Sequence, residues 1–241
     1  QHRQLLGWVS ICLMATWLIG PQARGATLFY DGFDGPWDTT TSQWNGNSAT
    51  WTNGSNIANF TTAPAGIVSL SEAITAGGLI FGLDGYRING GADPINNTLT
   101  LIAPGGLNSP VIQVGAFERA TLDVLLAGTS GFTKTGNGTL KLTNSSNSIS
   151  GDVVINGGNL VITDQAQLGT GTTTISVNGI AQTGNPGFSG SSLVLQGNVA
   201  GAGMTLSRDV SVSGRGPGAA NASGGLISVG NNTISGTLVL G

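Results

Sequence analysis

The residues of this sequence most able to support catalysis are its aspartates and glutamates, of which there are 11. Glycoside cleavage needs two carboxyl groups roughly 5–10 Å apart, which in a repetitive β-fold means acids at one position of neighbouring repeats. Asp123 and Asp164 come closest to that spacing (164 − 123 = 41), which suggests a shared face. Asp84, Asp93, Asp152 and Asp164 stand beside turn residues, where a solvated Asp is ordinary. We therefore expect turn acids, with polysaccharide cleavage as the enzymatic alternative.

Other catalytic and metal-binding chemistries find little support. Asp31, Asp34 and Asp38 are clustered as calcium ligands can be, but their spacing matches neither an EF-hand loop nor a nonapeptide calcium repeat. His2 and Cys12 are the only His and Cys, and both lie in a segment that we expect to be removed. We therefore predict no catalytic residue, metal ligand or cofactor, and we interpret the three aspartates as turn or cap residues.

Three tryptophans, Trp37, Trp44 and Trp51, are the candidate ligand-binding residues. They fall within 14 positions of one another (51 − 37 = 14), in an aromatic-rich stretch punctuated by Asp-Gly and Asn-Gly turns. Indole rings can stack on sugars, but large aromatic side chains also cover the apolar end of a repetitive fold. We favour the cap and keep the ligand platform as the alternative.

The N-terminus has the pattern of a secretory signal peptide. Arg3 precedes an apolar run over residues 5–19, and Ala23 and Gly25 are small residues at the −3 and −1 positions of a cleavage site before Ala26. A membrane anchor fits less well, because the run is shorter than the roughly 20 residues that a span needs. We predict a signal peptide over residues 1–25 and therefore an exported protein.

The composition is typical of many short strands joined by tight turns. Only 8% of the residues are charged, against about 25% in ordinary domains, and 41 of the 241 residues are Gly. Gly and Asn supply the positive φ angles that tight turns use. The net charge is −3 and only two residues are lysines, so the clustered positive charge that nucleic-acid binding needs is missing.

Residues 131–169 carry the clearest repeat. Apolar and polar residues alternate over 139–143, 152–156 and 159–163, as in strands with one buried face. Leu140 and Leu160 are 20 residues apart (160 − 140 = 20), and no helical period accompanies this spacing. Together these features predict an all-β fold, a parallel β-solenoid with coils of about 20 residues. We expect one 20-residue inward ladder through Leu79, Leu99, Leu140, Leu160 and Ile180.

The predicted organisation has three parts: the signal peptide at 1–25, an N-terminal cap and first coil at 26–62, and a repeat body at 63–241. Residues 147–155 (NSISGDVVI) resemble residues 232–240 (NTISGTLVL), so a second unit opens just before the chain stops. We therefore expect the repeat body to be truncated at its C-terminal end.

The 131–169 stretch resembles the autotransporter-associated β-strand repeat, also called the passenger-associated transport repeat. One position departs from that pattern, since Ile149 stands where the family often has an aromatic residue. The resemblance implies a right-handed parallel β-helix that bacteria export and either display at the cell surface or outer membrane or release. It also implies that the family shares no catalytic residues. The matching positions are Gly131, Lys134, Gly136, Gly138, Thr139, Leu140, Leu142, Gly151, Val153, Gly158 and Leu160.

Two functional hypotheses remain open from the sequence. The first is a structural or adhesin-like surface protein without enzymatic activity, which contacts surface polysaccharide or other cells through many weak contacts. The second is a carbohydrate-binding or polysaccharide-cleaving β-helix. Aligned acids and aromatic residues along a groove would favour the second hypothesis, and smooth Thr/Asn ladders the first.

Overall fold

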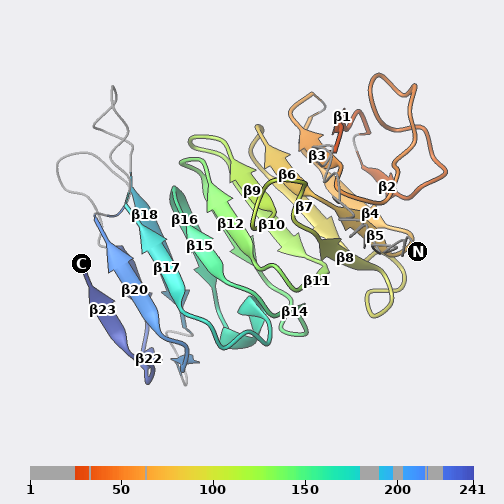
Figure 1. Ribbon diagram of the computed structural model, residues 1–241. Coiled ribbons are helices and arrows are strands. Elements are labelled where there is room, and N and C mark those ends of the chain that lie inside the picture. Colours follow the sequence, from red (N-terminus) through yellow and green to blue (C-terminus); the bar gives the residue numbers. More distant parts are fainter. Residues whose placement is uncertain are drawn as a thin grey trace, which may run out of the picture.

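The computed structural model describes residues 25–32, 34–62, 64–179, 190–197, 203–214, 216 and 225–241. The predicted signal peptide therefore lies, apart from residue 25, outside the described residues, as does Ile180. The described chain forms a parallel β-helix with three sides (Figure 1), as predicted. From β6 onward each coil places one strand in a nine-stranded sheet, the next in an eight-stranded sheet, and the third segment on a third side.

The nine-stranded sheet runs the whole length of the described β-helix. All its pairings between named strands are parallel, and neighbouring strands come from successive coils. Its strands, in stacking order, are β1 (Thr27–Phe29), β3 (Ile57–Phe60), β6 (Gly78–Phe81), β9 (Val111–Val114), β12 (Phe132–Thr135), β15 (Val153–Ile155), β17 (Ile175–Asn178), β20 (Val210–Ser213) and β23 (Leu238–Leu240).

The eight-stranded sheet forms the second side and is also parallel throughout its described pairings. Leu140 in this sheet pairs with Leu160, and Leu160 pairs with Leu193, so one buried aliphatic side chain lies above the next. Its strands are β2 (Gly35–Trp37), β4 (Ile67–Leu70), β7 (Tyr86–Asn89), β10 (Arg119–Asp123), β13 (Thr139–Leu142), β16 (Gly158–Ile162), β18 (Ser191–Gln196) and β21 (Leu226–Val229).

The third side is assembled from shorter pieces. A four-stranded sheet covers the earlier coils, a single 3₁₀ turn follows it, and a two-stranded sheet covers the last coils. The described residues contain no α-helix. The elements of this side are β5 (Ile74–Ala76), β8 (Thr98–Leu101), β11 (Leu125–Gly128), β14 (Ser148–Ile149), η1 (Gln165–Leu168), β19 (Thr205–Leu206) and β22 (Thr233–Ile234).

The predicted 20-residue ladder is only partly right. Leu140 and Leu160 do stack, but Leu79 lies in the nine-stranded sheet and Leu99 in the four-stranded sheet. Paired residues of successive coils are separated by 20 positions for Leu140 and Leu160 but by 35 for Ile175 and Val210 (210 − 175). The reason is that strand pairing constrains the three faces, whereas the loops at the corners accept insertions at small entropic cost.

Two glycines of the repeat show why its turns are so restricted. Gly136 has φ +73° and Gly158 has φ +64°, a region that side-chain-bearing residues rarely adopt. A Cβ on Gly136 would lie 2.1 Å from the Val114 carbonyl oxygen, and one on Gly158 would lie 2.1 Å from the Gly138 oxygen. Coils that stack about 4.8 Å apart leave no space for a side chain at these corners.

An aromatic cluster fills the core at the N-terminal end, as the cap prediction requires. Trp44 lies 4.8 Å from Trp51 and 5.4 Å from Trp37, measured between ring centroids, and Phe60 stacks on Phe81 at 5.1 Å. Such ring pairs each contribute about 0.5–1.5 kcal/mol beyond their buried area. Trp44 also forms antiparallel bridges to Tyr30 and Ala49, so the backbone of this segment lies along the outermost strands of the helix.

Candidate functional site: the outer face of the eight-stranded sheet

Strand register arranges the outward side chains of the eight-stranded sheet in rows. Side chains alternate along each strand, so residues paired between coils share one face. One row runs through Arg119, Thr139 and Asn159, and Asn159 donates a hydrogen bond from Nδ2 to Thr139 Oγ1 at 3.4 Å. A parallel row contains Arg87, Thr121, Lys141, Val161 and Val194.

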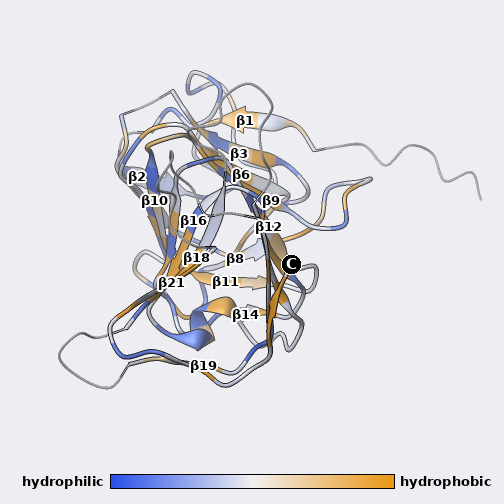
Figure 2. Cartoon of the chain, turned by 90° about the vertical axis from the view of Figure 1, so that its left-hand side faces the viewer, coloured by the Kyte–Doolittle hydropathy of each residue, from blue (hydrophilic) through white to orange (hydrophobic). Residues whose placement is uncertain are grey.

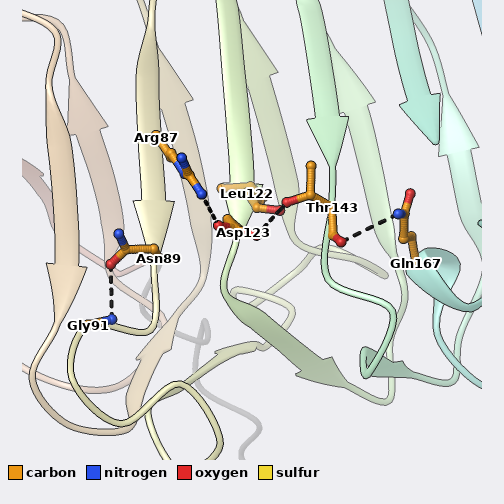
Figure 3. A network of polar contacts seen from close by, with 7 residues as sticks. All are labelled: Arg87, Asn89, Gly91, Leu122, Asp123, Thr143 and Gln167. Atoms are coloured by element: carbon orange, nitrogen blue, oxygen red, sulfur yellow. Dashed lines mark hydrogen bonds and ion pairs between the residues drawn. The ribbon is translucent and has the colours of Figure 1, made fainter. Parts of the chain in front are cut away.

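A polar network links four successive coils, beginning on this face and ending at η1 on the third side (Figure 3). Arg87 in β7 forms an ion pair with Asp123 in β10, and Thr143, just after β13, donates from Oγ1 to Asp123 at 2.7 Å. Gln167 in η1 donates from Nε2 to the Thr143 carbonyl oxygen at 3.4 Å. Partial burial acts to raise the pKa of Asp123, but the hydrogen bonds from Arg87 and Thr143 outweigh it, so this pKa is below its ordinary value.

The acid pair suggested by sequence spacing does not have the properties of a catalytic pair. Asp123 and Asp164 do lie on or beside the same sheet, in β10 and two residues after the end of β16. A general acid needs a raised pKa so that it holds a proton near neutral pH, whereas the pKa of Asp123 is lowered. Asp164 is the N-cap of η1, and its Oδ1 accepts from the Ala166 backbone N–H at 2.8 Å.

Most of the other predicted turn acids also have structural partners. Asp84 pairs with Arg119 at 2.9 Å, and the hydrogen bond from Arg119 lowers the pKa of Asp84. Asp93 accepts from the Asn96 side chain at 2.8 Å, which lowers its pKa. For Asp152 the described residues show no hydrogen bond to the side chain, so its solvated role stays a prediction.

The three N-terminal aspartates hold the first coil together. Asp34 accepts from the Ile67 backbone N–H at 2.6 Å, and Asp38 accepts from the backbone and hydroxyl groups of Thr40 and Thr41. Asp31 accepts from the Gly46 backbone N–H. No group of three or more His, Cys, Asp or Glu residues that could hold a metal ion occurs in the described part of the chain. These contacts support the predicted turn and cap roles.

The candidate tryptophans lie in the core. Trp37 and Trp44 are fully buried and Trp51 is 1% exposed, so none of them presents a ring face to a sugar. Trp51 donates from Nε1 to the Thr75 carbonyl oxygen at 3.3 Å, while Trp37 Nε1 and Trp44 Nε1 have no hydrogen-bond partner among the described residues. Stacking on a ligand requires exposed aromatic surface, so the burial of these rings favours the cap over the ligand platform.

Sequence reasoning missed a buried lysine. Lys134 in β12 is fully buried and pairs with Ile112 and Ile155 of the adjacent coils. Its Nζ donates to the carbonyl oxygens of Thr135, Gly136 and Gly157 at 2.8, 2.8 and 2.9 Å, and burial lowers its pKa to about 7. The available signal was strand alternation, which places Lys134 on the same side as the buried Phe132.

Comparison with known proteins agrees with the repeat found in the sequence. Residues 132–162 match the model of the passenger-associated-transport-repeat family. The chain is 32% identical over 193 residues to the adhesin BmaC autotransporter of Brucella suis biovar 1 (strain 1330). The match covers 77% of this chain and about 5% of that adhesin. No solved structure matches the chain. Among the helices of the described residues, none has the length and apolarity needed to cross a membrane.

Proposed function

We propose that this chain is part of an exported, adhesin-like β-helical passenger that acts by display rather than by catalysis. The observation that carries the proposal is the continuous three-sided β-helix whose outward rows bear Thr, Asn and a few charged side chains. The passenger-associated-transport-repeat match and the similarity to an autotransporter adhesin support the same class. The proposed places of action are the bacterial cell surface and the extracellular space.

The proposed mechanism is multivalent contact. Stacked coils repeat similar polar side chains about 4.8 Å apart along a rigid face, and many weak contacts of this kind together give strong attachment. The proposed partners are surface polysaccharide and other cells. Nucleic acid is not among them, because the net charge is −3 and the two lysines are on different sheets, one of them buried.

The proposed domain arrangement follows the sequence: a signal peptide at 1–25, a cap and first coil at 26–62, and repeat body from 63 onward. Fusing residues 1–25, after a start methionine, to an alkaline phosphatase that is active only after export tests the first part. Phosphatase activity in intact bacteria is the expected result. Activity no higher than that of a fusion without these residues would contradict the export proposal.

Adhesion is tested with beads coated by the chain at several densities and incubated with cells. A multivalent mechanism predicts that attachment rises steeply with coating density and that the soluble chain competes poorly. Beads carrying heat-denatured chain serve as the control. Attachment no greater than that of albumin-coated beads would refute the adhesive function.

Polysaccharide cleavage remains the second candidate function. The presence of Asp123 and Asp164 on or beside one sheet favours it, since glycoside cleavage uses two carboxyl groups. Against it, Asp123, Asp84 and Asp164 all have Arg or backbone partners. Incubating the chain with soluble polysaccharides and measuring new reducing ends tests this candidate. A steady release of reducing ends would replace the display proposal with an enzymatic one.

A further inference from the structure

A polar groove of about 700 Å³ lies beside the last coils of the eight-stranded sheet. This volume is within the roughly 300–1,000 Å³ of typical small-molecule sites. Figure 2 views the molecule from its C-terminal end, with β18, β19 and β21, which contribute residues to this groove, labelled. Its principal lining residues are Lys141, Asp164, Gln165, Gln196, Met204 and Val229.

Strand register positions the groove residues of the eight-stranded sheet. Lys141 pairs with Val161, which pairs with Val194, and Gln196 at the end of β18 pairs with Val229 of β21. The groove therefore crosses several coils on one face rather than lying within one loop.

The opposite wall is the η1 corner, which carries Asp164 and Gln165. Gln167, 2% exposed, holds this corner in place, since its Oε1 accepts from the Thr163 backbone N–H and its Nε2 donates to Thr163 Oγ1, both at 2.8 Å. Asn147 adds a second restraint by donating from Nδ2 to the Gln167 carbonyl oxygen at 2.7 Å. The wall is thus built by buried polar contacts before any ligand arrives.

Two polar groups of the groove are unused by the fold. Within the described part of the chain, neither the Lys141 ammonium nor the Gln196 amide has a hydrogen-bond or ion-pair partner. Asp164 commits Oδ1 to the η1 cap, and no described contact occupies its Oδ2. Met204, 8% exposed, and Val229 add apolar surface. Donors, acceptors and an apolar surface therefore converge on one hollow, as in small-molecule binding sites.

We infer that this groove binds a neutral oligosaccharide. Sugar hydroxyls both donate and accept, so they can satisfy the Lys141 ammonium, the Asp164 carboxylate and the Gln196 amide together. The C–H face of a sugar ring suits the apolar surface of Met204 and Val229. One cation and one anion leave the groove without net charge, and an anionic sugar would lie against Asp164. This site rests on the proposed adhesive function and names a ligand class for it.

Met204 provides a local reporter of binding. The chain has two methionines, Met14 and Met204, so ¹³C-methyl labelling of the full 241-residue chain yields two resonances, and Met204→Leu assigns them. Cellotriose, maltotriose and chitotriose are the neutral probes, and trigalacturonate is the anionic one. We expect at least one neutral trisaccharide to shift the Met204 methyl signal in a saturable way.

Matched variants then test the residues. Lys141→Ala should weaken binding about tenfold and Gln196→Ala about threefold or more, as expected for loss of a charge-assisted and a neutral hydrogen bond. Gln113→Ala, an exposed Gln on β9 of the other sheet, should leave affinity unchanged. Thermal unfolding of each variant checks that the fold is retained.

Three results would overturn the assignment. They are no Met204 shift with any neutral trisaccharide, unchanged affinity in both groove variants, and tighter binding of trigalacturonate than of every neutral probe. Bead adhesion by the unmodified chain without any trisaccharide binding would reject this groove while leaving the adhesive function standing. Loss of bead adhesion in the unmodified chain would instead reject the proposed function itself.

Discussion

The buried lysine of the repeat should make this protein more stable in mild alkali. Lys134 carries its ammonium into the core, and no described carboxylate pairs with it. Burial lowers its pKa from 10.5 to about 7 in the folded state, whereas the unfolded chain exposes the side chain to water and retains the ordinary value. Between these two values the unfolded state binds more protons than the folded state, so the free energy of unfolding rises with pH.

The size of the effect follows from the two pKa values. Each pH unit inside this window is worth up to about 1.4 kcal/mol. From about pH 7.5 to about pH 9.5 the gain is about 2.5 kcal/mol, because each state is partly titrated at one end of the interval. The contribution is complete above pH 10.5 and disappears as the pH falls towards 7. The three carbonyl oxygens around Lys134 Nζ oppose this lowering of its pKa, because they accept the three N–H donors of the ammonium and so favour the charged form.

Urea denaturation followed by circular dichroism at the two pH values measures the gain, with Lys134→Met as the perturbation. Lys134→Met removes the titrating group but keeps an unbranched apolar stem, so the variant should lose the 2.5 kcal/mol rise. Lys141→Met is the matched control, since Lys141 faces outward on β13, and it should retain the rise. The raised pKa values of Tyr30 and Tyr86 affect all three proteins alike and cancel in the comparison.

The reasoning is refuted if Lys134→Met and the unmodified chain show the same dependence on pH. That result would mean that the three carbonyl oxygens around Lys134 Nζ keep its pKa at the ordinary value. Unchanged stability of Lys134→Met at both pH values would further show that the three hydrogen bonds only offset the cost of burying the charge.

Further predictions concern the core and the third side. Leu140→Asp should unfold the chain or lower its free energy of unfolding by more than about 4 kcal/mol, because an unpaired charge would enter a fully buried stack. Lys141→Glu should change that free energy by less than about 0.5 kcal/mol. Equal effects of the two variants in chemical denaturation would show that the strand register is wrong. Asn147→Ala should cost about 2–4 kcal/mol, since it leaves the Leu126 backbone N–H and the Gln167 carbonyl oxygen without partners. Asn144→Ala, which loses one exposed turn contact, is its control, and a thermal melt in which the two variants unfold together would contradict this role.

Local sequence was enough to predict the class of fold. Alternation in residues such as Leu140 and Leu142 predicts a half-buried strand, and the Gly and Asn residues between strands predict tight turns; both are properties of neighbouring residues. The 20-residue spacing of Leu140 and Leu160 correctly predicted that they stack. The family resemblance over residues 131–169 was confirmed by the family match at residues 132–162. That motif could also be recognised locally, because it lies within consecutive coils.

The assignment of strands to sheets could not be predicted in this way. The segments NNTLTL, at 96–101, and NGTLKL, at 137–142, share four of their six residues. Even so, the first contributes β8 of the four-stranded sheet and the second β13 of the eight-stranded sheet. Strand propensity is the same in both places, so it carries no information about which side of the β-helix a strand occupies. Loop lengths between strands make that choice, and loops vary with little energetic penalty.

The candidate site likewise depended on tertiary structure. Composition identified few charged groups, but only the strand register placed Lys141 and Gln196 beside the η1 corner. The sequence favoured a cap role for the tryptophans but left a sugar platform open, and only the packing showed that the rings are buried. Burial depends on which residues from distant coils surround a side chain, so the residue type alone leaves it open, whereas turn and strand preferences are already present in the local chain.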